Sequence, residues 1–286
     1  MSYAICNETF EGWDHVRICA AAAKYGYGGL EIAPFTLATR ITDVTAERRR
    51  ILRQQANDAG LSIVGLHWLL AKTEGLMVTS PDAEVRRGTA EYLGELASCC
   101  RDLGGDLMVF GSPQQRRIPP GHSREQAADF ALETFRRALP AIADHGVRVC
   151  LEPLAPPEAD FLTTCAETVE LLDRIGSPQF MLHQDVKAMS SEAEPIPELI
   201  RKYAGRVGHF HANDANRRGP GFGDTDFRPI LRTLKETGYS GWVSVEVFDY
   251  TPDPDTIARE SIRYLKECEE SIPPPIPDSE AVCGGS

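Results

Sequence analysis

Acidic or imidazole side chains stand at the ends of four runs of sequence that are otherwise apolar and strand-like. The clearest case lies between positions 207 and 223, where an alternating run carries His209 and His211 and then opens into a loop rich in Asn, Arg and Gly. The four end residues are Glu152, Asp185, His211 and Glu246. Three carboxylates in one place would repel and raise one another's pKa values, and a divalent cation removes this repulsion. Three carboxylate oxygens and one imidazole suit Mn, Mg, Co or Fe better than a thiolate-rich zinc site does.

Eight strand-like runs alternate with eight helical runs along the chain. The expected strands are 3–10, 28–35, 61–70, 106–112, 148–153, 179–187, 206–212 and 241–248, and the expected helices are 12–25, 44–59, 81–103, 123–145, 163–175, 196–204, 227–237 and 255–269. We expect Ser80 to cap the third helix and Thr163 or Thr164 to cap the fifth. This alternation predicts a parallel sheet, and eight repeats predict an α/β protein with a single (β/α)8 TIM barrel. The barrel domain would span 1–271, and the Pro-rich segment 272–286 would be a flexible tail.

The barrel brings the four end residues together. Active sites of such barrels lie at the carboxyl ends of the strands, and these residues end four consecutive strands. The rival fold, an open doubly wound sheet, would need a Gly-rich phosphate-binding turn after the first strand, and the run 6–10 has none. Taken singly, a strand Glu is commonly an ion-pair residue and a strand His commonly a hydrogen-bonded core residue. The set of four favours a metal site over four separate explanations.

Composition limits the classes of function and the expected compartment. The net charge is −12 without a long basic run, which argues against a nucleic-acid partner. Eight scattered cysteines without a C-x-x-C pair favour the reducing cytoplasm. We expect neither a membrane span nor a signal peptide, because no run is apolar enough and the start of the chain lacks a basic segment followed by an apolar one. Whether the chain forms a homo-oligomer is left open.

Short motifs along the whole barrel carry a family resemblance. They are Gly29-Leu-Glu-Ile, Gly65-Leu-His67, Leu151-Glu-Pro-Leu followed by Glu158 and Phe161, His183-Gln-Asp185, Gly208-His-Phe-His211 with Asn216-Arg217-Arg218-Gly-Pro-Gly221, and Val245-Glu246. With these motifs the chain resembles the sugar phosphate isomerase/epimerase superfamily of xylose-isomerase-like TIM barrels, and within it the ketose 3-epimerase branch that acts on tagatose and allulose.

The resemblance implies roles for individual residues. The metal ligands would be Glu152, Asp185, His211 and Glu246, with one divalent ion bound, manganese first and Mg, Co, Fe or Zn as alternatives. Glu152 and Glu246 would also be the catalytic acid/base pair. A metal that holds the carbonyl and neighbouring hydroxyl oxygens stabilises an enediolate, so one carboxylate can remove a proton from one face of the sugar and the other can return one to the opposite face. The side chains expected to bind the sugar or keto-sugar are Glu158, Arg217, His67, Lys187 and His183.

Two departures from the epimerase pattern fall where substrate hydroxyls would be recognised. The expected substrate-binding His is Ala188, beside Lys187, and an expected Asn is Ala155. Lys187 either replaces the lost donor or is a surface lysine. Trp13 and Trp68 are candidate pocket walls, and Glu31 could bind substrate or an Arg. These changes leave the metal chemistry in place and leave the substrate open.

Three other functions remain open at this point. A metal-dependent dehydratase, lyase or hydrolase acting on keto-inositols or 3-keto-sugars would begin with the same proton abstraction. An endonuclease IV-like enzyme would need further metal ligands that positions 110–112 and Ala188 do not supply. A non-catalytic sugar-binding barrel would be expected to lack a ligand or a base, and none is missing.

Overall fold

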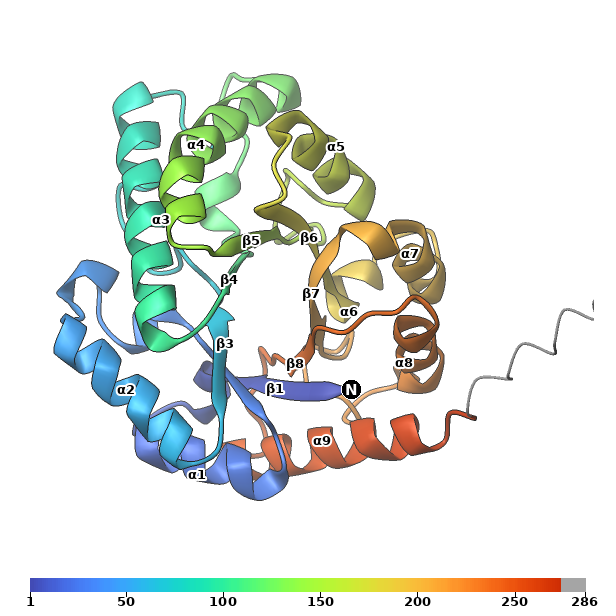
Figure 1. Cartoon of the computed structure of the whole chain (residues 1–286). Coiled ribbons are helices and arrows are strands. Elements are labelled where there is room, and N and C mark those ends of the chain that lie inside the picture. The colour runs from blue at the N-terminus through green and yellow to red at the C-terminus, as the bar shows by residue number, and fades with distance from the viewer. Residues whose placement is uncertain (274–286) are drawn as a thin grey trace, which may run out of the picture.

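Eight parallel strands close into a barrel in the computed structural model, which describes residues 1–273, and their order around the barrel is their order in the chain (Figure 1). The strands are β1 Ser2–Cys6, β2 Gly29–Ile32, β3 Ser62–Leu66, β4 Leu107–Phe110, β5 Arg148–Leu151, β6 Phe180–Asp185, β7 Val207–Ala212 and β8 Trp242–Val245. β1 pairs with β8, which closes the ring. The predicted single (β/α)8 barrel is therefore confirmed.

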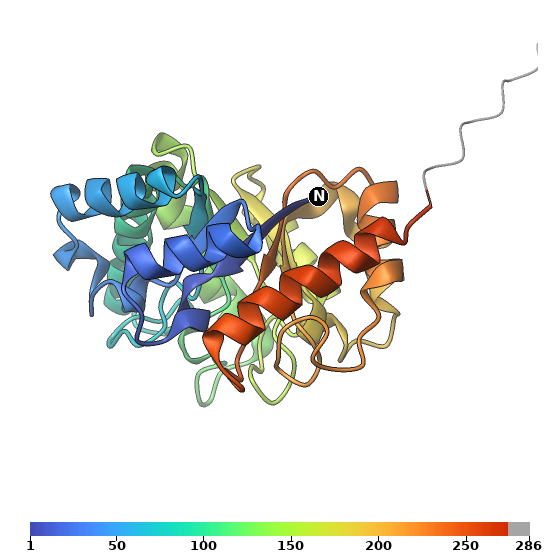
Figure 2. The ribbon, with the colours of Figure 1, turned by 90° about the horizontal axis from the view of Figure 1, so that it is seen from below.

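Helices surround the strands on the outside of the ring (Figures 1 and 2). They are α1 His15–Tyr25, α2 Ala46–Asp58, α3 Ala83–Leu103, α4 Arg124–Asp144, α5 Cys165–Ile175, α6 Val186–Met189, α7 Ile196–Tyr203, α8 Phe227–Glu236 and α9 Pro254–Glu270. Short 3-10 helices lie at Asn7–Phe10, Pro34–Thr36, Ile41–Asp43, Gln114–Arg116 and Ala204–Arg206. The one-turn helix α6 was not expected from the sequence. Of the predicted tail, 274–286 lies outside the described residues.

Several element ends differ from the predicted ones for local reasons. α3 is capped by Asp82, whose side chain accepts a hydrogen bond from the backbone N–H of Glu84, so the prediction of Ser80 as the cap is wrong. Thr164 caps α5, as one of the two predicted alternatives. β1 and β3 are shorter than predicted, because the 3-10 helix Asn7–Phe10 follows β1 and Trp68, just after β3, has a φ of 51° that ends the strand conformation.

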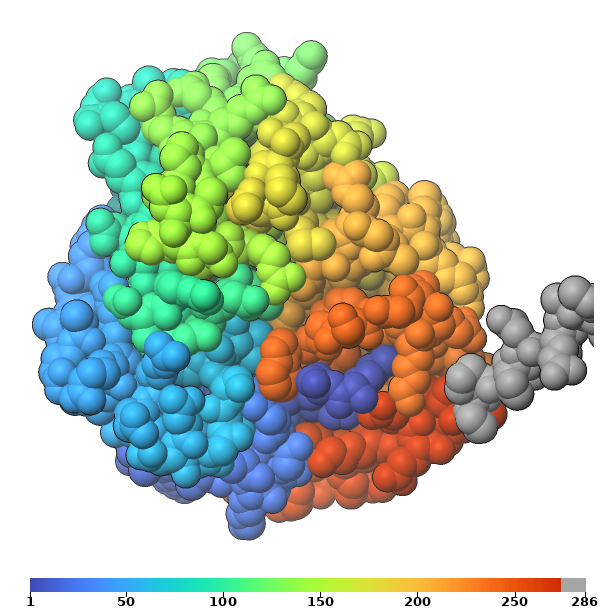
Figure 3. Space-filling model, viewed as in Figure 1, coloured from blue at the N-terminus to red at the C-terminus, as the bar shows by residue number. Residues whose placement is uncertain are grey.

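The interior of the barrel changes from apolar to polar along the strands. Toward their amino ends, one small apolar cluster fills it, formed by Ala4, Val64, Leu107, Val109 and Cys150 with Met181 and Trp242 packed against them. Side chains two residues apart on a strand share a face. The next inward-facing residues after Met181 and Trp242 are therefore His183 and Ser244, and both are polar. In the space-filling view, atoms occupy most of the space within the ring (Figure 3). Within residues 1–273, no helix combines the length and apolar character that crossing a bilayer requires.

Candidate active site

The four predicted end residues meet at the carboxyl ends of β5 to β8. Asp185 lies opposite His211 in the register of β6 and β7, and His211 lies opposite Ser244 of β8, two residues before Glu246. Glu152, Asp185 and His211, together with His183, each offer a ligand atom, and these atoms lie within 4.8 Å of one another. Glu246 joins them through its Oε2 atom, 3.1 Å from His211 Nδ1. All five side chains are buried.

Burial and mutual repulsion shift the acid strengths of these carboxyl groups. Burial, followed by the nearby charges of Glu246 and Asp185, raises the pKa of Glu152 well above its usual value. Burial and the charge of Glu246 likewise raise the pKa of Asp185 to about 6. The pKa of Glu246 lies below its usual range, because the His211 and His67 rings outweigh the opposing effect of burial. The cluster holds more negative charge than its own imidazoles neutralise, and a divalent cation would supply the missing positive charge.

The donor atoms fit a divalent cation. Both ring nitrogens of buried His183 lack a hydrogen-bond partner among the described residues. The centroids of the His183 and His211 rings are 4.2 Å apart. Buried polar atoms are nearly always paired, so an unpaired imidazole beside the carboxylates of Glu152 and Asp185 is what a metal-binding cluster would show. Carboxylate oxygens with one or two imidazole nitrogens match the preferences of Mn, Mg, Co or Fe.

Neighbouring side chains orient the candidate ligands. The backbone N–H of Ala188 donates to Asp185 Oδ1 at 2.7 Å, and Asn213 Nδ2 donates to Asp185 Oδ2 at 2.5 Å. Glu31 from β2 reaches across the barrel, with Oε1 3.1 Å from His211 Nε2 and Oε2 2.9 Å from His209 Nε2. A carboxylate on the far nitrogen of a ligating His fixes its ring and tautomer. Glu31 therefore positions a candidate ligand, and its carboxylate pairs with these two imidazoles and not with an Arg.

A buried arginine holds the backbone from which Glu152 projects. Arg116 is 0% exposed, and its Nη1 atom donates to the carbonyl oxygen of Glu152 at 2.6 Å, while Nη2 donates to the carbonyl oxygen of Phe110 at 2.8 Å. Burial lowers the pKa of Arg116 to about 10, so the group stays charged at neutral pH. The sequence suggested only a polar loop here, because carbonyl partners leave no mark on residue types.

Replacing Arg116 by Met is expected to destabilise the fold, because two buried carbonyl oxygens lose their charged donor. An unpaired buried polar group costs about 1–3 kcal/mol, so the loss should exceed about 2 kcal/mol in urea unfolding. Arg117→Met is the matched control, since its half-buried side chain makes no comparable contacts, and it should change stability by less than about 0.5 kcal/mol. Equal stability of the two variants would contradict the assigned role of Arg116.

Three of the predicted substrate-binding residues lie around one aromatic ring, that of Phe248. Lys187 Nζ forms an ion pair with Glu158 Oε2 at 2.6 Å and lies 4.6 Å from the Phe248 ring centroid. The Arg217 guanidinium lies over the same ring at 5.8 Å. Lys187 is thus turned toward the site and is not a surface lysine, which places a cation beside the position that Ala188 leaves without a donor.

The remaining predicted contacts lie deeper in the barrel. His183 packs edge-on against His211, with ring centroids 4.2 Å apart. His67 lies between two carboxylates, with Nε2 2.8 Å from Glu8 Oε2 and Nδ1 3.4 Å from Glu246 Oε1. Trp68 Nε1 donates to Glu246 Oε1 at 2.7 Å. Glu8 was missed from the sequence, because it lies in the 3-10 helix Asn7–Phe10 where a longer strand was expected.

A parallel barrel with buried carboxylates and imidazoles at the carboxyl ends of its strands has the architecture of a TIM-barrel enzyme. The family model described as xylose isomerase-like TIM barrel matches residues 19–268. The chain belongs to this family, which confirms the resemblance found in its motifs.

Characterised relatives match most of the chain. D-psicose 3-epimerase of Agrobacterium fabrum is 28% identical over 231 residues, covering 79% of this chain and 76% of the relative. Fructoselysine 3-epimerase of Escherichia coli O157:H7 is 27% identical over 254 residues, covering 86% of this chain and 90% of the relative. The crystal structure of a D-psicose 3-epimerase in the presence of D-fructose superposes with a TM-score of 0.82 at 20% identity, covering 94% of this chain and 99% of that one. A 3-keto-D-glucoside 4-epimerase from E. coli gives a TM-score of 0.82 at 18% identity, covering 94% of this chain and 100% of that one. These two structures support the fold.

Proposed function

We propose that this chain is a divalent-metal-dependent sugar epimerase that moves a proton on the carbon next to a ketone, with ketose 3-epimerisation as its reaction and manganese as its metal. The observation that carries the proposal is the convergence of Glu152 and Glu246, which directly follow β5 and β8, on the cluster that contains Asp185 and His211. The ketose 3-epimerase relatives support the same reaction. We assign the metal to Glu152, Asp185, His211 and Glu246, with His183 as a neighbouring donor.

Two carboxylates on different strands give the reaction its stereochemical outcome. A bound divalent cation would stabilise the negative charge that develops on the substrate oxygens when the C–H bond breaks. Glu246 takes the proton from one face of the sugar, held in place by the Trp68 and His211 contacts, while Glu152 gives a proton to the other face. Proton return to the opposite face inverts the carbon, and the roles exchange in the reverse direction.

The side chains that we propose to bind substrate lie around the ring of Phe248. Arg217, Lys187 and Glu158 offer two cations and a carboxylate, which can bind hydroxyl groups. The Lys187–Glu158 ion pair lies beside Ala188, the position where the epimerase pattern has a His, so we expect a hydroxyl arrangement different from that of the relatives. The side chains of Glu152 and Glu246 are buried, which limits the contact of bulk water with the two carboxylates.

A second candidate is elimination or hydrolysis on a 3-keto-sugar or keto-inositol. It shares the proton abstraction and differs only in the group that leaves the neighbouring carbon. A large cavity beside Glu8 and Trp68 favours it, since it would accommodate a leaving group that free ketoses lack.

Removal and return of metal tests the proposal directly. Chelator-treated protein should lose deuterium uptake from D2O into ketoses, and Mn should restore it, as followed by NMR. Exchange at carbon 3 with a new epimer supports epimerisation. Exchange at carbon 1 with an aldose product would make the enzyme an isomerase, and exchange followed by loss of water or an aglycone would make it a lyase. Metal-loaded protein that exchanges no ketose and no 3-keto-sugar would refute the proposed chemistry.

A further inference from the structure

A second group of potential metal ligands lies beside the candidate metal cluster. Glu8 follows β1, His67 follows β3 and Glu246 follows β8, and each offers one ligand atom within 4.8 Å of the other two. We propose that this group binds a second divalent cation, which shares Glu246 with the first cation and inhibits the enzyme. The inhibition rests on the proposed function, but the binding of the ion does not.

The polar atoms of Glu8 and His67 are buried without hydrogen-bond partners. Glu8 is 5% exposed and His67 is 0% exposed. Neither carboxylate oxygen of Glu8 and neither ring nitrogen of His67 has a hydrogen-bond partner within residues 1–273. Because buried polar atoms are nearly always paired, these four atoms indicate that the two side chains bind a ligand.

The distances around the His67 ring fit the ligands of one ion better than they fit hydrogen bonds. Glu8 Oε2 lies 2.8 Å from Nε2, and Glu246 Oε1 lies 3.4 Å from Nδ1, but neither pair has hydrogen-bond geometry. Two ligand atoms that are each about 2.1 Å from one ion lie about 3.0–3.4 Å apart, depending on whether the coordination is octahedral or tetrahedral. A cation next to His67 would therefore bring both carboxylates into its coordination with only small movements.

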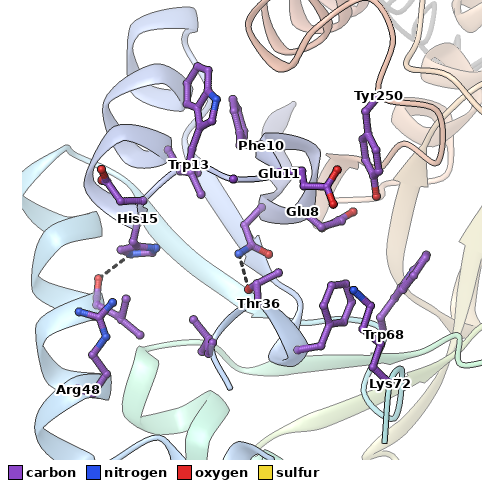
Figure 4. Close-up of a pocket in the computed structure, with 17 residues that line it drawn as sticks. Glu8, Phe10, Glu11, Trp13, His15, Thr36, Arg48, Trp68, Lys72 and Tyr250 are labelled. Atoms are coloured by element: carbon purple, nitrogen blue, oxygen red, sulfur yellow. Dashed lines mark hydrogen bonds between the residues drawn. The ribbon is translucent and has the colours of Figure 1, made fainter. Parts of the chain in front are cut away.

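The donor types and the surroundings of the group suit a divalent ion such as Mn. Carboxylate oxygens with one imidazole nitrogen are donors that Mn, Fe and Zn accept. Glu8 also lines a cavity of about 710 Å³, and Figure 4 shows it at the cavity wall near Glu11 and Tyr250. The cavity gives an ion and its remaining water ligands access to Glu8 without passing through the first cluster.

Glu246 connects the two ions and explains the inhibition. Its Oε2 atom lies 3.1 Å from His211 Nδ1 of the first cluster, whereas its Oε1 atom faces His67. A cation beside a carboxylate stabilises the charged form, so a Glu246 side chain that binds two cations accepts a proton less readily. The second ion should bind more weakly than the first, because it has three protein ligands instead of four and the first ion repels it.

Manganese binding to metal-free protein tests the site without turnover. Calorimetry should show two ions per chain, the second bound at least about tenfold more weakly than the first. Because the two Mn ions share a carboxylate, electron paramagnetic resonance should show magnetic coupling between them. Glu8→Gln should abolish the second binding event. Glu11→Gln is the matched control, since Glu11 is an exposed carboxylate that lines the same cavity outside the ligand group, and it should keep both ions.

Deuterium exchange into a ketose tests the inhibition. The rate should rise as the first ion binds and then fall at least about tenfold as the second ion binds, which is less than the factor of about 10²–10⁴ expected for complete loss of one base. In Glu8→Gln the rate, relative to its own maximum, should reach a plateau and not fall. Glu11→Gln should show the same rise and fall as the wild type.

The possible results separate this inference from the proposed reaction. One Mn per chain in the wild type, or a second ion that Glu8→Gln does not affect, would overturn the inference and leave the epimerase proposal intact. Two ions without a fall in rate would overturn the inhibition. Two coupled ions that depend on Glu8, with no exchange into any ketose at any Mn concentration, would support the second metal site and remove the proposed reaction.

Discussion

Glu246→Gln is expected to lower kcat by a factor of about 10²–10⁴, the usual contribution of one positioned acid or base. The amide cannot accept the proton, and its NH2 group must face either the indole N–H of Trp68 or the ring of His211, which are 2.7 and 3.1 Å from the present oxygens. Glu152→Gln should have an effect of similar size, because the two carboxylates act on opposite faces of the sugar.

Metal content distinguishes the two roles assigned to Glu246. If the Glu246→Gln protein retains its metal and loses kcat, the missing base explains the loss. If it loses both metal and kcat, the missing ligand explains the loss. Glu91→Gln, on the exposed face of α3, is the control and should change neither quantity. Unchanged kcat in Glu246→Gln would rule out this carboxylate as acid or base.

Gly111→Ala is expected to remove most of the activity while leaving the fold nearly intact. A Cβ atom at Gly111 would lie 1.7 Å from Glu152 Oε2, so the carboxylate must move. The carboxylate ends a flexible side chain, so a rotation relieves the clash at small cost in folding free energy. Displacement of a catalytic group by about 1 Å can cost about 10²-fold in rate, and we expect kcat/KM to fall by about that factor.

A second glycine provides the control for this variant. Gly88, within α3, has open space where a Cβ would lie, so Gly88→Ala should leave activity unchanged and stabilise the protein by about 0.5–1 kcal/mol. Wild-type kcat/KM in Gly111→Ala would show that Glu152 is not held where the reaction needs it. Unfolding of Gly111→Ala in urea measures whether any loss of activity comes from lost stability.

The strands and the four end residues could be predicted because their signals are local. His211 and Asp185 each interrupt an apolar run. The parallel arrangement of neighbouring strands follows from the alternation of strand and helix. The barrel fold then fixes which ends meet. The ligand assignment itself stays a prediction until metal is measured.

The supporting residues could not be predicted, because their partners come from the far side of the ring. Glu31 lies on β2, and its contacts with His209 and His211 exist only once β1 and β8 have closed the barrel. Arg116 pairs with backbone carbonyls, which every residue carries. The left-handed backbone of Trp68 likewise follows from packing and not from its residue type, since a bulky side chain disfavours it.

The position of Trp68 also makes the intrinsic tryptophan fluorescence of this protein sensitive to the cavity. The chain has three tryptophans, of which Trp13 and Trp68 line the cavity. The third, Trp242, packs at the opposite end of the barrel interior. Two indole chromophores therefore respond to the contents of one cavity, while the third serves as an internal reference for emission, so that occupancy can be followed optically in unlabelled protein.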